Sequence, residues 1–412
     1  MLRADHMTKH CIIIGASHAA GQCVASLRQS GWEGDITLIG DEPHVPYHRP
    51  PLSKAYLSGE KTKTELLIRP REAYESVGAD LKLNTRVARI DRKLKTITTE
   101  KGETMGYDKL VLATGARVRK LTLDGAAHKQ VFYLRDMADV TAIKAEVSVG
   151  KRAVIIGGGY IGLETAASLT KLGVKVTVLE AMPRILQRVT APALSAFYKR
   201  VHTEEGVRIE ENVSAASIEK DGLNLTVLDK IGTKYPADFV IIGIGVIPNI
   251  ELAEDCNLEV GNGIVVNEYC QTSDPDIYAA GDVTWHYNIK YDRHIRLESV
   301  PNATEQAKIA ASHICGKAKA YDALPWFWSD QYDLKLQIAG LSSGYDDLVI
   351  RGDSEQGRSF AAFYFKGDQF LAVDAVNAPR EFALSRMVLT KGQNLDKQKL
   401  GDVELSLKEA IL

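Results

Sequence analysis

Short apolar runs alternate with amphipathic segments from Cys11 to the region of Cys315. The runs CIII (residues 11–14) and AVII (residues 153–156) each end in a glycine-rich turn, and a helix-like segment follows each turn. Such alternation predicts an α/β fold with parallel strands. The longest apolar run, FVIIGIGVI, has nine residues (239–247), which suits a buried parallel strand and is too short to span a membrane.

The pattern changes beyond residue 324. LKLQIAG, DDLVIRG, SFAAFYF and QFLAVDAV predict largely antiparallel strands joined by turns, and REFALSRMVLTKG predicts a helix that ends at Gly392. Further upstream, LKLNTRVARID and KTITTEKG predict a hairpin added to the first α/β region. The chain therefore divides into two α/β regions and a separate C-terminal α+β domain.

The turn in AVIIGGGYIGLETAASL matches the dinucleotide-binding fingerprint in full. Gly157 allows a sharp turn out of the strand, Gly159 lets the backbone approach a pyrophosphate, and Gly162 permits close packing of the helix on the strand. The helix N-terminus offers free N–H groups to the phosphates, so Tyr160 and Ile161 are candidate contacts as well.

An acidic residue follows this turn at the spacing expected for a ribose contact. Glu180 lies 23 residues after Gly157, at the end of VKVTVLE. A carboxylate at this place accepts a hydrogen bond from the ribose 2′-OH of NAD and repels the 2′-phosphate of NADP. We therefore expect NAD to be preferred, although Arg184 and Arg188 nearby weaken the preference.

The first turn, in CIIIGASHAAG, is a weaker match that lies 142 residues upstream (position 15 against position 157). Gly15 leads it, but Ser17 and Ala20 stand where the second and third glycines belong. The Ser17 side chain crowds a pyrophosphate, although its hydroxyl is able to hydrogen-bond it. DITLIGDE then supplies Asp41 and Glu42 for a ribose. Two such turns imply that two dinucleotides meet, one of them a flavin.

The segment VPYHRPPLSKAYL carries candidate catalytic chemistry. Pro50 and Pro51 fix the backbone, and Arg49 and Lys54 flank them. A positioned lysine ammonium stabilises negative charge on a reduced flavin. Glu164, which we place in the first turn of the second helix, is a candidate partner that would hold Lys54 charged and oriented. The alternative is that Lys54 is a solvated surface residue.

Three other segments add candidate cofactor contacts. Asp282 follows an apolar strand and suits a flavin's ribityl hydroxyls; alternatively, it is a helix N-cap. The strand in YDKLVLATGAR ends in the small residues Thr114 and Gly115, as expected of a turn that closes on a cofactor. PWFWSDQYD contains an aromatic cluster in which Trp328 either belongs to the core or lines the flavin.

Composition limits the classes of partner and compartment. The chain has 412 residues, of which 45% are hydrophobic and 25% are charged, with a net charge of −2. These values fit a globular protein of two or three domains that binds neither nucleic acid nor membranes. The N-terminus has no apolar signal core, so we expect a cytoplasmic protein, and Met7 offers an alternative start.

The cysteines indicate no redox or metal chemistry. The chain has five, with no CxxC and no metal-ligand spacing, and we expect buried thiols without a disulfide or a metal: Cys11, Cys23, Cys256, Cys270 and Cys315. This argues against disulfide reductases, which need a cysteine pair in the first domain. It also argues against NADH oxidases and peroxidases, which need a single redox cysteine where PPLSK lies.

These motifs resemble those of the FAD-dependent NADH:ferredoxin reductases of bacterial oxygenase systems. The resemblance covers nearly the whole chain, and it rests on GWEGDITLIGDE, PPLSKAYL, YDKLVLATGAR, RAVIIGGGYIGLE, VTAPALSAFY, GIVVNEYCQTSDP, LESVPNATEQA and PWFWSDQYDLKLQIAGLSSGYD. PPLSKAYL and the last two are specific to this branch. The resemblance implies a glutathione-reductase-like α/β fold with two Rossmann-like domains, an FAD-binding domain (1–117 and 246–322) and an NAD-binding domain (118–245), followed by a C-terminal α+β domain (323–412).

The resemblance also implies roles for individual residues. Lys54 and Glu164 would lie near the flavin ring, and Trp328 beside it. The implied FAD contacts are Ala19, Asp41, Lys54, Val87, Arg135, Asp282 and Val300, to which the motifs add Gly15, Ser17, Ala20, Arg49, Thr114 and Gly115. Ser17 departs from the family's glycine at the pyrophosphate turn, and Arg49 precedes the double proline where the family differs.

The expected function is transfer of electrons from NADH through FAD, one at a time, to a [2Fe–2S] ferredoxin that serves an oxygenase such as a cytochrome P450. Alternatives are a rubredoxin or monodehydroascorbate reductase and an NADH-sensing flavoprotein of the apoptosis-inducing-factor type. We expect the ferredoxin to dock on a basic patch, for which residues 290–296, Lys308 and Lys335 are candidates, although these are equally well ordinary surface charges. A monomer or weak dimer is expected.

Overall fold

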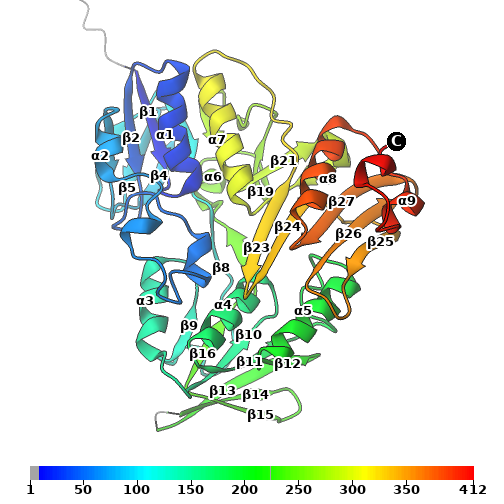
Figure 1. The fold of residues 1–412 in the computed structure, drawn as a ribbon. Coiled ribbons are helices and arrows are strands. Elements are labelled where there is room, and N and C mark those ends of the chain that lie inside the picture. The colour runs from blue at the N-terminus through cyan, green and yellow to red at the C-terminus, as the bar shows by residue number, and fades with distance from the viewer. Residues whose placement is uncertain (1–8, 223) are drawn as a thin grey trace, which may run out of the picture. The chain divides into compact units, whose positions relative to one another are not determined.

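The computed structural model describes residues 9–222 and 224–412, so the alternative start at Met7 lies outside the described residues. The chain forms two compact units (Figure 1). The first unit comprises residues up to 49, 63–117 and 247–323, and the second comprises residues 50–62, 118–246 and 324–412. The chain passes from one unit to the other after residues 49, 62, 117, 246 and 323, and β8 (Ala116–Val118) and β17 (Val246–Pro248) lie at two of these crossings.

A five-stranded parallel sheet forms the centre of the first unit. Its order is β20-β7-β1-β2-β3, with β1 (His10–Ile14), β2 (Asp35–Ile39), β3 (Ala79–Lys82), β7 (Lys109–Leu112) and β20 (Ile277–Ala279). Along β1, Cys11 and Ile13 face one core cluster and Ile12 and Ile14 face another, so both faces of the sheet are buried. Helices α1 (His18–Ser30) and α7 (Val300–Ile314) pack against each other in the first of these clusters.

The hairpin predicted for the first unit is present, but its first strand was placed wrongly. An antiparallel sheet forms from β4 (Val87–Asp91), β5 (Thr96–Thr99) and β6 (Thr104–Gly106). Leu81 and Lys82 of the LKL run belong instead to β3, where Leu81 pairs with Leu38 at the edge of the parallel sheet. The remaining elements of the unit are α2 (Arg71–Glu75), α6 (Glu251–Asp255), η2 (Thr64–Leu66), η3 (Ile289–Tyr291), β18 (Val260–Gly261), β19 (Gly263–Val266), β21 (Thr284–Asn288) and β22 (Arg293–Ile295).

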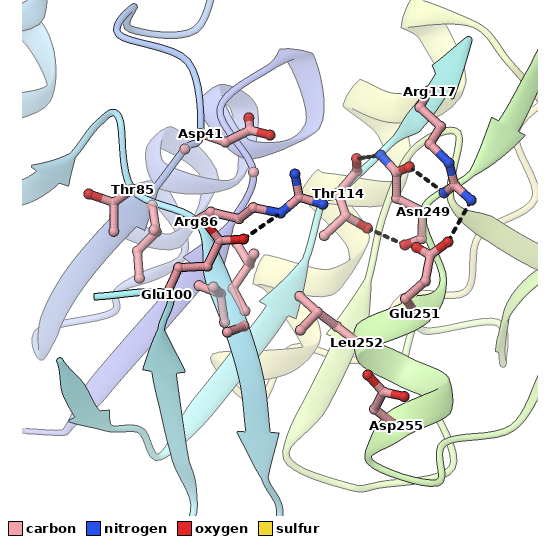
Figure 2. A pocket seen from close by; sticks show the side chains of 16 residues that line it. Asp41, Thr85, Arg86, Glu100, Thr114, Arg117, Asn249, Glu251, Leu252 and Asp255 are labelled. Carbon is pink, nitrogen blue, oxygen red and sulfur yellow. Dashed lines mark hydrogen bonds and ion pairs between the residues drawn. The ribbon is translucent and has the colours of Figure 1, made fainter. Parts of the chain in front are cut away.

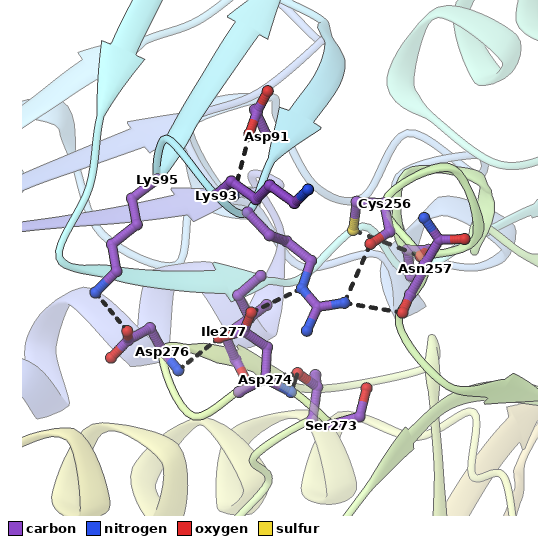
Figure 3. A network of polar contacts seen from close by, with 12 residues as sticks. Asp91, Lys93, Lys95, Cys256, Asn257, Ser273, Asp274, Asp276 and Ile277 are labelled. Atoms are coloured by element: carbon purple, nitrogen blue, oxygen red, sulfur yellow. Dashed lines mark hydrogen bonds and ion pairs between the residues drawn. The ribbon is translucent and has the colours of Figure 1, made fainter.

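A polar network joins the separate chain segments of the first unit (Figure 3). Arg92 Nε lies 2.7 Å from Asp274 Oδ2, and Arg92 Nη1 donates to the carbonyl of Asn257 at 2.9 Å. Lys95 Nζ lies 2.6 Å from Asp276 Oδ2. These contacts tie the β4–β5 hairpin to Asn257, just after α6, and to the segment that leads into β20, although each partner is more than 150 positions away in sequence.

The second unit repeats the parallel architecture. Its sheet has the order β12-β11-β10-β16-β9, with β9 (Val131–Tyr133), β10 (Arg152–Ile156), β11 (Lys175–Glu180), β12 (Arg208–Glu211) and β16 (Phe239–Ile242). The first four residues of the apolar run 239–247 form the buried parallel strand β16, whereas the run was predicted as one strand; Val246 and Ile247 belong to β17 instead. The other elements are η1 (Pro50–Ser53), α3 (Met137–Glu146), α4 (Tyr160–Lys171), α5 (Pro192–Glu204), β13 (Ala215–Asp221), β14 (Asn224–Asp229) and β15 (Lys234–Ala237).

The second unit also contains the antiparallel sheet predicted for the C-terminal region. Its order is β23-β24-β27-β26-β25, with β23 (Trp326–Gln331), β24 (Leu334–Gly340), β25 (Asp347–Asp353), β26 (Ser359–Lys366) and β27 (Gln369–Val376). Helix α8 (Pro379–Lys391) ends at Gly392, whose φ of +67° suits the glycine that closes a helix. Two short elements, α9 (Lys397–Gly401) and η4 (Leu407–Ala410), follow. The predicted α/β fold with an α+β C-terminal region is confirmed.

A buried acid in this region should make stability depend on pH. Burial raises the pKa of Asp374 to about 6, and the hydroxyls of Tyr364 and Thr190 are its partners. Because the folded state then binds the proton more tightly than the unfolded state, the stability that Asp374 contributes is complete below its unfolded pKa and is lost as pH rises through its folded pKa.

We therefore expect the difference in unfolding free energy between Asp374→Asn and the wild type to change with pH. Between acid and neutral pH it should move in favour of the variant by about 3 kcal/mol. Thermal unfolding of both proteins across this range measures the difference. A difference that is the same at every pH would contradict the assignment.

Candidate dinucleotide sites and a buried lysine–glutamate pair

Gly15 forms the sharp turn at the end of β1. Its φ is +123°, and a Cβ built there would lie 2.1 Å from the carbonyl oxygen of Ala113. The Gly15 amide donates to the Ile39 carbonyl at 2.7 Å. No side chain fits at this position, so the first turn requires its leading glycine even where it departs from the fingerprint.

The departure at Ser17 has a structural partner. Arg49 Nε lies 3.2 Å from Ser17 Oγ, at the N-cap of α1. Arg49 also contacts Glu42 Oε1 at 2.5 Å and the Tyr47 hydroxyl at 3.2 Å. The structure therefore places the Arg49 guanidinium at the N-terminus of α1, beside Ser17. The same guanidinium forms an ion pair with Glu42, whereas Asp41 is exposed.

Beside this turn lies a pocket of about 570 Å³, in the range of ligand sites (Figure 2). Four predicted FAD residues line it: Gly15, Asp41, Val87 and Thr114. Thr114 and Asn249 exchange two hydrogen bonds, of 2.9 and 2.8 Å, across the lining. Two ion pairs, Arg86–Glu100 (3.3 Å) and Arg117–Glu251 (2.7 Å), also lie there.

No sequence motif predicted Asn249 as part of the pocket lining. It lies more than 130 positions from Thr114, and only the fold brings the two together. Three other predicted contacts lie near the first turn or after β7: Gly115 has a φ of +63°, and Ala19 and Ala20 are buried in α1.

The remaining predicted FAD contacts are distributed between the units. Asp282 lies in a turn between β20 and β21, so its alternative role as a helix N-cap is wrong. Ser299 caps α7 instead, and its side chain accepts a hydrogen bond from the backbone amide of Asn302. Val300 is the first residue of that helix. Lys54 and Arg135 belong to the second unit, and the other predicted FAD residues belong to the first.

The second glycine turn shows why each glycine is needed. A Cβ at Gly157 would lie 2.3 Å from the Gly243 carbonyl oxygen, and one at Gly162 would lie 2.1 Å from the Gly157 carbonyl oxygen. A Cβ at Gly159 would meet no atom of the described residues within 4 Å. Packing explains the first and third glycines, whereas the second faces open space of the kind that a pyrophosphate would fill.

The neighbours of Gly159 differ in exposure. The side chain of Ile161 is 46% exposed beside the turn. The hydroxyl of Tyr160 is buried, and it has no hydrogen-bond partner among the described residues.

Glu180 contacts the glycine turn directly. Its Oε2 accepts from the Gly158 amide at 2.7 Å, and its Oε1 accepts from the Met182 amide at 2.8 Å. Arg184, a candidate phosphate ligand, is held by Ser195 Oγ at 2.6 Å and by the Gln187 carbonyl at 3.2 Å. The carboxylate therefore lies at the nucleotide turn, while one of the two nearby arginines is engaged elsewhere.

We expect Glu180→Ala to narrow the preference for NADH over NADPH roughly tenfold, because a charged hydrogen-bond acceptor for the 2′-OH is lost. The ratio of kcat/KM for the two nucleotides measures the effect. An unchanged ratio would remove Glu180 from the ribose site.

The side chains of Lys54 and Glu164 form an ion pair in the second unit. Lys54 Nζ lies 2.9 Å from Glu164 Oε1, and the Glu164 side chain is only 2% exposed. Ser53 Oγ donates to Glu164 Oε2 at 2.5 Å, and Ser329 Oγ donates to Glu164 Oε1 at 2.6 Å. Ser168, one turn along α4, donates to the Ser53 carbonyl at 2.7 Å and fixes η1 against the helix.

The predicted place of Glu164 in the helix was wrong. Helix α4 begins at Tyr160, so Glu164 opens the second turn and has no direct contact with the free N–H groups of the first. The three side-chain donors at the carboxylate stabilise its charge instead.

Trp328 lies on β23, and its ring centroid is 5.6 Å from that of Trp326. Trp326 also packs against Phe382, and both indoles are half-buried, so the cluster is part core and part surface. The candidate basic residues are partly neutralised: Arg296 pairs with Glu298 and Lys308 pairs with Glu305, each at 2.6 Å. Residues 290–296 and Lys308 belong to the first unit, and Lys335 to the second.

The cysteines are unpaired. Four of the five are buried and Cys315 is half-buried, and burial raises the pKa of Cys23 to about 12. The described residues contain no group of three or more His, Cys, Asp or Glu side chains placed to hold a metal. In the part of the chain that the structure covers, no helix combines the length and apolar character needed to cross a bilayer.

Comparison with known proteins identifies the family. Residues 9–307 match the pyridine nucleotide-disulphide oxidoreductase family, and residues 326–411 match the reductase C-terminal family. The chain belongs to the pyridine nucleotide-disulphide oxidoreductases. It is a flavoprotein oxidoreductase of the ferredoxin reductase type, whose cofactors are FAD and NAD(H).

Individual relatives are similar over almost their full length. Putidaredoxin reductase CamA from Pseudomonas putida is 46% identical over 97% of this chain and 96% of its own. The ferredoxin reductase subunit of 5,5′-dehydrodivanillate O-demethylase from Sphingobium sp. is 42% identical over 97% of each chain. The crystal structure of the covalent putidaredoxin reductase–putidaredoxin complex matches with a TM-score of 0.94 and 43% identity, over 98% of each chain.

Proposed function

We propose that this oxidoreductase passes electrons from NADH through FAD, one at a time, to a [2Fe–2S] ferredoxin that serves an oxygenase such as a cytochrome P450. The observation that carries the proposal is that one chain contains two parallel-sheet units, each with its own glycine turn and acidic residue. The likeness to reductases named for their ferredoxins and oxygenases supports the acceptor.

The residues of the first unit suit FAD. The pocket lined by Gly15, Asp41, Val87 and Thr114 has room for part of a dinucleotide, and the Arg49 guanidinium beside Ser17 is suited to a pyrophosphate. We assign FAD binding to residues 1–117 and 246–322, with Ala19, Ala20, Gly115, Asp282 and Val300 as further contacts and with Lys54 and Arg135 contributed from elsewhere in the chain.

The residues of the second unit suit NADH. We assign it to residues 118–245, with the pyrophosphate in the open space at Gly159, the ribose on Glu180, and Ile161 against the bases or nicotinamide. Arg188 is an added candidate for a phosphate, because it is exposed and its Nη2 lies 3.9 Å from the position of a Cβ at Gly245.

Bound FAD supplies the redox chemistry, since it takes a hydride and releases electrons singly. In our proposal Lys54 places a positive charge beside the flavin ring, Glu164 orients that charge, and Trp328 covers the ring. Residues 323–412 form the C-terminal domain that carries Trp328. The protein adds no covalent nucleophile.

The ferredoxin is expected to dock through positive charges, of which residues 290–296, Lys308 and Lys335 are candidates. We further propose a cytoplasmic protein that is a monomer or weak dimer. Rapid steady-state reduction of a [2Fe–2S] ferredoxin by NADH tests the function. Slow turnover with a long-lived complex of reduced flavin and NAD would favour the NADH-sensing alternative.

A further inference from the structure

The Glu164 carboxylate lies at one end of a continuous chain of side-chain hydrogen bonds within the second unit. Ser329 Oγ lies 2.6 Å from Glu164 Oε1, and Gln331 Nε2 lies 3.2 Å from Ser329 Oγ. Gln331 Oε1 then lies 2.7 Å from His202 Nε2. The Tyr332 hydroxyl completes the chain, 3.0 Å from His202 Nδ1.

Nearly every member of this chain is shielded from water. Ser329 and His202 are 0% exposed, and Gln331 and Glu164 are each 2% exposed. Ser329 and Gln331 are two positions apart on β23, so they lie on the same face of the strand, while His202 comes from α5 and Glu164 from α4. In such surroundings hydrogen bonds are strengthened because water does not compete.

The chemistry of the groups fixes the direction of the chain. An amide oxygen only accepts, so His202 Nε2 carries the proton and donates to Gln331 Oε1. The Gln331 amide nitrogen donates to Ser329 Oγ, which leaves the Ser329 hydroxyl proton for Glu164. Burial lowers the pKa of His202 to about 4, so the imidazole is neutral and its Nδ1 accepts from Tyr332. Every donor therefore points toward Glu164.

We propose that Ser329, Gln331 and His202 are positioning residues that hold the Glu164 carboxylate in place opposite Lys54, and that they couple α5 to this ion pair. The aligned donors stabilise the buried negative charge without adding a second cation. This inference rests on the proposed function, in which the ion pair serves the flavin.

The coupling is tested by nuclear magnetic resonance of the FAD-loaded protein labelled with ¹⁵N-histidine, with His202 assigned from His202→Phe. We expect wild-type His202 to be protonated at Nε2, and Glu164→Gln to shift its ring nitrogen signals although the two residues do not touch. Thr165→Val is the control and should leave the signals unchanged, because within the described residues the Thr165 hydroxyl donates only to the Ile161 carbonyl of α4. His202 signals that do not respond to Glu164→Gln would overturn the proposal.

The functional consequence is tested by stopped-flow reduction with NADH. We expect Ser329→Ala to lower the rate constant for flavin reduction roughly tenfold, since a hydrogen bond to a charged group is lost, and Ser329→Thr to restore it. Ser385→Ala is a matched control, because the Ser385 hydroxyl is buried without a partner among the described residues.

The two levels of the proposal fail separately. If NADH does not reduce the flavin of the wild type, the proposed function is wrong. The change of the His202 signals in Glu164→Gln can still be measured in that case. A wild type that reduces ferredoxin, together with Ser329→Ala at the wild-type rate, would end the positioning role alone.

Discussion

Replacing Lys54 with methionine is expected to slow the reduction of bound FAD by NADH roughly 100-fold without releasing FAD. The substitution keeps most of the apolar stem and removes the only cation paired with the buried Glu164 carboxylate in the described residues. Charge stabilisation placed where negative charge develops is worth this much in other active sites. Stopped-flow absorbance gives the rate constant, and the flavin content of the purified variant gives retention.

Two variants separate the rate effect from folding. Lys54→Met leaves Glu164 buried and under-compensated, which destabilises the second unit, so Lys54→Met/Glu164→Gln should recover thermal stability but not the rate. Lys61→Met removes an exposed lysine from the same segment and should behave as the wild type. A wild-type rate in Lys54→Met would leave Lys54 with a structural role only, in its ion pair with Glu164.

Replacing Gly159 with leucine should raise the KM for NADH roughly 100-fold and leave FAD content unchanged. The backbone at Gly159 has ordinary angles (φ −82°, ψ 179°), and a Cβ there would meet no described atom within 4 Å, so the variant should fold. The side chain would instead occupy the space that we assign to the pyrophosphate. The dependence of the stopped-flow rate constant for flavin reduction on NADH concentration measures the loss of NADH affinity.

Gly106→Leu is the matched control, because a Cβ at Gly106 would come no nearer than 3.9 Å to a described atom, the Lys95 carbonyl oxygen, and Gly106 lies in β6, outside both sites. Gly162→Ala offers a contrast: its Cβ would lie 2.1 Å from the Gly157 carbonyl oxygen, so it should lose stability as well as NADH binding. Normal NADH affinity in Gly159→Leu would mean that the nucleotide does not cross this turn.

Local sequence patterns predicted the parts of the fold that depend on interactions between neighbouring residues, such as backbone sterics and helix capping. The glycine turns at Gly15 and Gly157 follow from steric limits on the backbone, and the helix end at Gly392 follows from helix capping. The error at β3 shows the limit of this approach. The short run LKL fits a hairpin or a parallel edge strand equally well, and the pairing of Leu81 with Leu38 decides between them.

The sites depend more on contacts between distant residues. The sequence pattern indicated only that Ser17 replaces a glycine of the FAD turn. Its contact with Arg49 could not be predicted, because Arg49 lies 32 positions away on a different segment. The pairing of Lys54 with Glu164 was predicted, but the Ser329 hydroxyl on the same carboxylate was not. The hydrogen-bond partner of a strand serine cannot be predicted from the local sequence, because the packing of β23 against α4 determines that contact.

The central claim is that electrons pass from NADH through FAD to a ferredoxin, and an anaerobic titration tests it most directly. The purified protein is titrated with NADH, its absorbance is followed, and a [2Fe–2S] ferredoxin is then mixed in. We predict a yellow protein that one equivalent of NADH bleaches and that the ferredoxin rapidly reoxidises. Bleaching without transfer to any ferredoxin, or a protein that holds no flavin, would contradict the account.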